Sequence, residues 1–312
     1  MLNKYFYYNK NYFIIQLPKE VIGMVLNKTD LHMHSIYSDG SNTPEELIER
    51  SIKQKTTTIA LTDHDNIEGA KEIIRLNNGR LYIYSGVELT IKAPKGRFHL
   101  LGYNIDLENK QLNKELKKQK EDGLYNIMLY IEVLKKDFGI IIPQSEIEAL
   151  YKIPGNVGRP QLALLLIKLG YCKEVEECFT KYLIHAYDKV REVKKGITAE
   201  QGIELITNAG GIPIIAHPNS LKLAYQELKD YIIYLKSIGL KGLECEHPNL
   251  SMEERYVYHE FCKELDLLES GGTDYHGIDI KPDIEIGSGR KGNIYIPENL
   301  LTLTKQIKSR YM

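Results

Sequence analysis

From residue 29 onward, short apolar runs typical of β-strands alternate with segments that have helical patterns. This alternation indicates a mostly parallel sheet or an α/β barrel, because parallel neighbours are joined by helical crossovers. Two of the predicted helices begin with capping boxes, at residues 43–46 and 198–201. Strands are predicted at residues 29–34, 57–62, 81–89, 98–104, 212–217, 242–246 and 267–274.

The alternation is interrupted between residues 108 and 195, where only helices are predicted. We therefore expect an α/β barrel formed by residues 28–107 and 196–312, with an all-helical subdomain inserted at 108–195. A barrel can occupy roughly 250 residues as a single domain, so the rest of the chain is long enough for one. Residues 1–27 form a lead-in of unknown role. The helices of the insertion are predicted at residues 110–136, 144–150, 160–169 and 174–186.

The composition excludes several classes of protein. With 43% hydrophobic residues and a net charge of −1, the chain can bury a core and is not disordered overall. No apolar run reaches the roughly 18 residues of a membrane helix, and no secretory signal is recognised, so no membrane association is expected. The 41 basic residues are balanced by 42 acidic ones, which argues against a long nucleic acid as partner. The four cysteines form no Cys-x-x-Cys pair, which favours a reducing, cytoplasmic compartment.

Several predicted strands end in histidines and carboxylates. His32 and His34 alternate along the first strand and therefore share one face, where two imidazoles can chelate a metal ion. Asp39 follows in the next loop, and His64 ends the second strand between two aspartates. Taken singly, these residues also fit a half-buried strand and a solvated strand–helix turn.

The later strands repeat the pattern. Glu88 lies inside an apolar run, where a buried carboxylate needs a cation, although a strand with one wet face would also explain it. His99 alone fits a hydrogen-bonded core histidine, and His217 ends an apolar strand. Asp274 and His276 again alternate, after two glycines. Because all these groups are predicted at the carboxyl ends of successive strands, where barrels build their sites, we interpret them jointly as a metal centre.

The predicted ligands are imidazoles and carboxylates without thiolate, a set that suits manganese, iron or zinc, with manganese preferred here. Nine groups exceed the coordination of one ion, so two or three divalent ions sharing carboxylates are expected. Three carboxylates leave such a centre with net positive charge, which attracts phosphate. A metal-bound hydroxide would then attack phosphorus.

These residues resemble the PHP family, named for polymerase and histidinol phosphatase domains. The Asp-Leu-His-Met-His run at 30–34 and the Thr-Asp-His-Asp run at 62–65 look like its first two motifs. The resemblance implies a distorted (β/α)7 barrel, in which Glu88, Asp274, His217 and His276 would take part in catalysis. By the same resemblance, the metal ligands would be His32, His34, Asp39, His64, Glu88, His99, His217, Asp274 and His276.

The predicted insertion contains a Gly-Arg-Pro-Gln-Leu-Ala motif at 158–163. It is similar to a motif of stand-alone PHP phosphoesterases that act on nucleoside 3′,5′-bisphosphates or on the 5′ end of short RNAs, although Gln161 stands where histidine is usual. The expected substrate is accordingly a small phosphorylated nucleotide. Arg159, just before a proline-started helix, is the candidate phosphate clamp, and it equally fits a surface arginine. Arg290 and His247 are further candidates for substrate binding.

Three other functions remain open at this point. Histidinol-phosphate phosphatase would use the same chemistry on another substrate. A catalytically silent metal-binding module would keep the ligands without turnover. Carbon–nitrogen hydrolysis would need a bridging lysine, and none is obvious. The remaining histidines, His185 and His259, are predicted to be structural, and the sequence predicts no oligomeric state.

Overall fold

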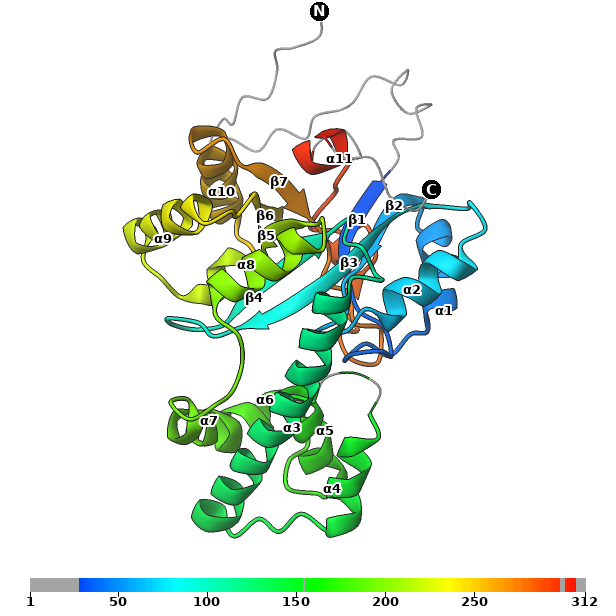
Figure 1. Ribbon diagram of the computed structural model, residues 1–312. Coiled ribbons are helices and arrows are strands. Elements are labelled where there is room, and N and C mark those ends of the chain that lie inside the picture. The colour runs from blue at the N-terminus through cyan, green and yellow to red at the C-terminus, as the bar shows by residue number, and fades with distance from the viewer. Residues whose placement is uncertain (1–27, 154, 156, 298–300, 307–312) are drawn as a thin grey trace, which may run out of the picture.

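The computed structural model describes residues 28–153, 155, 157–297 and 301–306 (Figure 1). The expected lead-in at 1–27 lies outside the described residues. Seven strands form one sheet in chain order, and they run parallel except β4, which is antiparallel to both β3 and β5. The strands are β1 (Lys28–Met33), β2 (Thr56–Leu61), β3 (Tyr82–Ile91), β4 (Phe98–Tyr103), β5 (Ile212–Ile215), β6 (Gly242–Glu246) and β7 (Leu268–Gly271).

The expected closed barrel is not confirmed. Within the described residues no hydrogen-bonded ladder joins β7 to β1, so the sheet is open at this point. The two edges are instead connected after β7 has ended: His34 donates its backbone N–H to the carbonyl of Tyr275, and the carboxylate of Asp30 accepts from the N–H and hydroxyl of Thr273. The α/β class and the mostly parallel sheet are as predicted.

Helices cover the sheet on its outer side (Figure 1). The predicted capping boxes are confirmed at Thr43 with Glu46 and at Thr198 with Gln201, because each pair bonds reciprocally. Among the described residues no helix is long and apolar enough to cross a membrane. The covering helices are α1 (Pro44–Lys53), α2 (Glu68–Leu76), α8 (Ala199–Asn208), α9 (Tyr225–Ser237), α10 (Met252–Glu264) and α11 (Thr302–Gln306).

Between β4 and β5 the described chain is helical and packs around a hydrophobic cluster of its own. The first turns of the long α3 contribute Leu112 and Leu116 to the main core, whereas its later turns contribute Tyr130 and Leu134 to the second cluster. The helix predicted at 174–186 is interrupted by a π-helical turn, Phe179–Leu183. These helices, which extend away from the sheet in Figure 1, are α3 (Lys110–Phe138), α4 (Gln144–Tyr151), α5 (Arg159–Lys168), α6 (Val175–Cys178) and α7 (Ile184–Val190).

Two strands end earlier than predicted. Strand β5 stops two residues before His217, and β7 stops three residues before Asp274. Both residues have positive φ, 28° and 51°, which a strand does not accommodate. The backbone therefore turns at these positions, and such unfavourable torsions are concentrated at functional sites.

Candidate metal centre

All nine predicted ligands converge at one edge of the sheet. Most of them lie at or beyond the carboxyl ends of parallel strands, as expected. His99 differs, because it is the second residue of the antiparallel β4. The beginning of an antiparallel strand lies at the edge where its parallel neighbours end, so His99 joins the others from the opposite chain direction.

Glu88 is the centre of the cluster. Its side chain is completely buried in β3, and five imidazole nitrogens surround its two carboxylate oxygens. The two oxygens face different sets of rings, which suits a carboxylate that bridges two cations. From Oε2 the distances are 3.1 Å to His32 Nε2, 3.2 Å to His34 Nε2 and 3.3 Å to His64 Nδ1; from Oε1 they are 2.8 Å to His99 Nδ1 and 3.0 Å to His217 Nε2.

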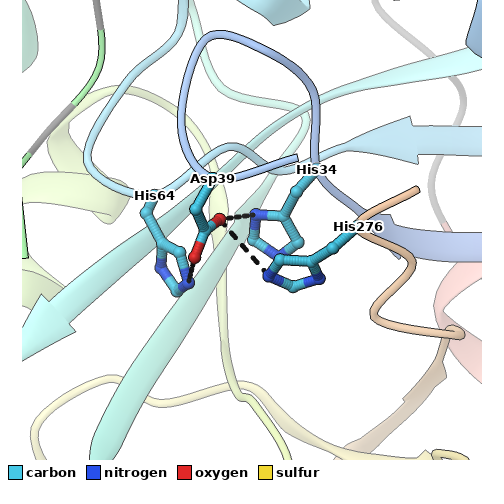
Figure 2. A group of neighbouring side chains, drawn as sticks. All are labelled: His34, Asp39, His64 and His276. Atoms are coloured by element: carbon cyan, nitrogen blue, oxygen red, sulfur yellow. Dashed lines mark ion pairs between the residues drawn. The ribbon is translucent and has the colours of Figure 1, made fainter. Parts of the chain in front are cut away.

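Asp39 holds a second group together (Figure 2). Its Oδ1 lies 3.3 Å from His276 Nε2 and 3.7 Å from His34 Nδ1, and its Oδ2 lies 3.8 Å from His64 Nε2. Figure 2 shows the three rings directed at this one carboxylate. These four side chains are close enough to share one metal ion.

Asp274 connects the cluster to a lysine and to a further histidine. Its Oδ1 lies 3.2 Å from His34 Nε2 and 3.5 Å from His32 Nε2. Its Oδ2 accepts from Lys281 Nζ at 2.6 Å and lies 3.6 Å from His247 Nε2. The candidate substrate residue His247 is thus buried against the centre itself.

Hydrogen bonds at Nδ1 set the tautomers of the rings. His32 Nδ1 lies 2.9 Å from Oε1 of the buried Glu244, and a carboxylate can only accept, so the proton is on Nδ1. His217 Nδ1 lies 2.9 Å from Ser220 Oγ, whose own proton goes to the carbonyl of Arg97. With Nδ1 held as a donor, Nε2 is the nitrogen of each ring that faces Glu88 and would bind a metal ion after losing its proton.

Nδ1 of His34 and Nδ1 of His276 also face hydrogen-bond acceptors. His34 Nδ1 lies 3.4 Å from Ser38 Oγ, which gives its proton to Asp63 at 2.6 Å. His276 Nδ1 donates to the carbonyl of Asp274 at 2.8 Å. Four of the predicted ligands are thus oriented with Nε2 directed at the shared carboxylates.

The carboxylates of the centre are held ionised. Burial alone would raise their pKa values, yet the imidazoles of His64 and His32 keep the pKa of Glu88 well below its usual range. At Asp274 the opposing charge of Lys281 outweighs burial and keeps the pKa low. Buried negative charge of this kind calls for cations.

The imidazoles divide into two kinds. Burial lowers the pKa of His99 and of His276 to about 4, so both rings are neutral at pH 7. For His34 burial also favours the neutral ring, but the carboxylates of Asp274 and Glu88 beside it outweigh burial and raise the pKa to about 9. A divalent cation at this position would displace that proton.

The residues present fit divalent metal ions. Within the described chain, several buried polar atoms make no hydrogen bond although they point into the cluster. Such atoms are costly unless a ligand occupies them. The donor set of neutral imidazoles and ionised carboxylates suits first-row divalent ions. The atoms are His34 Nε2, Asp39 Oδ1, His64 Nδ1 and His247 Nε2.

Sequence reasoning missed two residues of this environment. Glu244 is a buried carboxylate inside β6, as Glu88 is inside β3, and its place in the middle of a predicted strand could have singled it out. It also accepts the backbone N–H of His217 at 2.6 Å. Lys281 follows in an irregular segment, and nothing in the local sequence marks it.

Two further candidates for substrate binding are Arg159 and Arg290. Arg159 begins α5 and stacks on Tyr187 and Phe179. Arg290 forms an ion pair with Asp283 and donates to Asn249, so its charge is already matched. Its role in substrate binding stays a prediction.

The histidines that were expected to be structural lie apart from the centre. His185 pairs with Asp137 at 2.7 Å in the helical segment. His259 lies between Glu246 and Glu269.

The sequence is similar to a known protein family and to characterised enzymes. The PHP domain model matches residues 30–246. The chain is 30% identical over 253 residues to the 5′-3′ exoribonuclease Rnm of Escherichia coli, covering 79% of this chain and 84% of that protein. It is 26% identical over 261 residues to the 3′,5′-nucleoside bisphosphate phosphatase of Chromobacterium violaceum, covering 79% and 86%.

A solved structure is also similar. It is described as an amidohydrolase from Chromobacterium violaceum with bound sulfate and no metal, with a TM-score of 0.72 and 25% identity over 83% of this chain and 90% of that one. The family model covers more than half of the sequence, and the curated relatives are hydrolases of phosphate esters. The chain therefore belongs to the PHP domain family, and it is a hydrolase of phosphate ester bonds.

Proposed function

We propose that this protein is a metal-dependent phosphoesterase that hydrolyses a phosphate ester of a small nucleotide. The observation that carries the proposal is the buried Glu88 among five imidazoles, beside Asp39 and Asp274. The substrate would be a nucleoside 3′,5′-bisphosphate or the 5′ end of a short RNA, the activities for which two relatives are named.

The nine converging side chains would hold two or three divalent ions, with manganese the first candidate. Such ions supply positive charge to phosphate oxygens and promote the ionisation of water. Glu88 faces imidazoles with both oxygens, so it would be shared between ions, and the group around Asp39 would hold another.

The protein's own groups orient this chemistry. Glu244 and Ser220 accept from Nδ1 of His32 and His217, so Nε2 of each ring is the nitrogen that would bind an ion. Lys281 neutralises one oxygen of Asp274, and its ammonium group would also attract the substrate phosphate. Among the described residues His247 Nε2 has no hydrogen-bond partner, and it faces the same carboxylate, so this ring would exchange a proton with the leaving oxygen.

The first experiment is a substrate panel. The purified protein is stripped with chelator, Mn²⁺ is restored, and phosphate release is measured from adenosine 3′,5′-bisphosphate, a short 5′-phosphorylated RNA, histidinol phosphate and an aryl phosphate. Metal-dependent release from either nucleotide supports the proposal. Release from histidinol phosphate alone would assign the biosynthetic reaction instead, and no release with metal bound would point to a silent module.

Removal of one central charge tests the site itself. We expect Glu88→Gln and Asp274→Asn to lower kcat by at least about 100-fold while the far-ultraviolet circular dichroism is unchanged, because ligand charge is lost but volume is kept. The exposed Glu264 in α10 offers a matched control, Glu264→Gln. Full activity in either central variant would refute the assignment.

A further inference from the structure

Four basic side chains belong to the helical segment and to the hairpin of β3 and β4. Arg159 and Lys194 contact the same ring of Tyr187, and burial first, then the charges of Arg97 and Lys92, lower their respective pKa values. Two are on the hairpin, Lys92 directly after β3 and Arg97 directly before β4. The other two belong to the helical segment, Arg159 at the start of α5 and Lys194 just after α7. We refer to Lys92, Arg97, Arg159 and Lys194 as the basic cluster.

The hairpin side of the basic cluster is attached to the metal centre. Arg97 donates its N–H to the carbonyl of Ser220 at 2.8 Å and accepts from the Ser220 hydroxyl at 3.0 Å. The same hydroxyl accepts from Nδ1 of His217. A single serine therefore fixes both a candidate metal ligand and the backbone that carries Arg97.

The helical side is held against the centre as well. Gly155, four residues before Arg159, packs so closely on the loop of Tyr37 and Ser38 that a Cβ atom there would overlap the carbonyl oxygen of Tyr37. Asp39 is the next residue of that loop. Gly155 thus lies beside the loop that carries Asp39.

Aromatic rings, and not carboxylates, position the two cations of the helical side. The guanidinium of Arg159 lies 4.7 Å from the ring centre of Tyr187 and 5.7 Å from that of Phe179. Lys194 Nζ lies 5.2 Å from the same Tyr187 ring. Cation–π contacts orient a charge without neutralising it.

The basic cluster lacks a matching negative charge. Within the described part of the chain, none of its four members forms an ion pair, whereas the neighbouring Lys195 pairs with Asp122 at 4.0 Å. Burial, and after it the positive charges of Arg159 and Lys92, lower the pKa of Lys194 to about 8. Arg159 and Lys194 are half-buried, whereas Lys92 and Arg97 are exposed. Partly buried like charges without an anion are unfavourable, so a bound anion would stabilise Arg159 and Lys194.

We propose that the basic cluster binds a second phosphate group of the substrate while the first is hydrolysed at the metal centre. This inference rests on the proposed function and assigns residues to the second phosphate group that its substrates carry. The second group is the other terminal phosphate of a nucleoside bisphosphate, or the next phosphodiester of an oligonucleotide. Arginine and lysine from both sides would enclose the anion, with the guanidinium of Arg159 already oriented by its rings.

The test compares substrates with one and two phosphate groups. Lys194→Met and Arg97→Gln are assayed on adenosine 3′,5′-bisphosphate, on a 5′-phosphorylated dinucleotide and on an aryl phosphate. We expect the ratio of kcat/KM for two-phosphate substrates to that for the aryl phosphate to fall at least tenfold, mainly through KM. The matched control is Lys195→Met, which removes the adjacent lysine that pairs with Asp122 and should leave the ratio unchanged.

The outcomes separate the sources of the anion. A greater effect on the bisphosphate assigns the basic cluster to a terminal phosphate, and a greater effect on the dinucleotide assigns it to the phosphodiester. An equal loss on all three substrates, or no loss, overturns the inference.

Calorimetry distinguishes failure of the inference from failure of the proposed function. Binding of adenosine 3′,5′-bisphosphate is measured after chelator treatment, so no turnover is needed. The wild type should bind at least about fivefold more tightly than Lys194→Met. Equal affinities would refute the basic cluster as an anion site even if the enzyme is active, whereas a difference without phosphate release in the panel would leave the anion site standing and refute only the phosphoesterase.

Discussion

At the residue scale, the properties of the centre come from a second layer of buried acceptors. Glu244 is the clearest example, because one carboxylate takes the Nδ1 proton of His32 and the backbone N–H of His217. Glu244 therefore orients the ring of His32 and holds the backbone turn that carries His217. Outer partners of this kind commonly contribute about 10-fold to 100-fold to metal affinity.

Replacing Glu244 tests this role. Glu244→Gln keeps the shape, but an amide can accept with only one of its two ends, so either His32 or the His217 backbone loses its partner. We expect Mn²⁺ affinity to fall about 10-fold to 100-fold, measured by competition with a fluorescent chelator. Glu246→Gln, on the same strand but bonded to His259, is the comparison variant. Unaltered affinity in Glu244→Gln would show that the contact is only structural.

At the scale of elements, helix α10 is tied to the sheet by one histidine. His259 bonds Glu246 of β6 at 3.0 Å and Glu269 of β7 at 2.8 Å, and Arg255 lies 3.5 Å from the same Glu246. Burial favours the neutral ring, but the two carboxylates outweigh it and raise the pKa of His259 to about 9. The protonated form therefore holds the helix on the strands.

A pH dependence of stability follows. Because the pKa is raised on folding, the contribution is complete below the unfolded pKa near 6.5 and is lost as the pH rises through about 9. The free energy of unfolding of the wild type should exceed that of His259→Gln by about 2 kcal/mol at pH 6 and by much less at pH 9.5. Urea titrations of both proteins at these two pH values measure it. A difference that does not change with pH would contradict the assignment.

At the scale of the whole molecule, the chain after β7 packs tightly against β1 to form a join, although no ladder of hydrogen bonds connects the two strands in the described part of the chain. A Cβ atom on Gly272 would overlap the backbone nitrogen and Cβ of His32. Asp30 spans the same join and accepts from Thr273 and from the N–H of Gly287. The open sheet is thus held together at the residues that precede the metal centre.

Gly272→Ala tests that join. We expect it to lower the free energy of unfolding by roughly 1–3 kcal/mol and to weaken Mn²⁺ binding, because the added methyl group must displace His32. Urea unfolding and chelator competition give the two quantities. Retention of both wild-type values would show that β1 and β7 can separate without cost.

Metal loading should also stabilise the fold. An ion that binds only the native state, at 100 times its dissociation constant, adds about 2.7 kcal/mol. Thermal unfolding should therefore shift to higher temperature as Mn²⁺ is added to chelator-treated protein, and Glu88→Gln should show a smaller shift. If Mn²⁺ leaves the midpoint of the wild type unchanged, the side chains do not form a metal centre in the native state.

We propose that residues 108–195 act as a separate helical subdomain. The second hydrophobic cluster supports this division, and the shared helix α3 explains how the helices keep their place beside the centre. The helical prediction depended on local periodicity alone. The π-helical turn at Phe179–Leu183, which local patterns do not mark, interrupts what appeared in the sequence as one helix.

The sequence by itself determined the strands, most of the helices and all nine candidate ligands, because apolar periodicity and polar strand ends are local patterns. The tertiary structure decided the antiparallel direction of β4, the open join between β7 and β1, and the places of Glu244 and Lys281. These depend on contacts between residues far apart in the chain: Glu244 lies 212 positions from His32, whose proton it accepts. Local periodicity indicates that a carboxylate such as Glu244 is buried, and only the assembled sheet shows that it contacts the ring of His32.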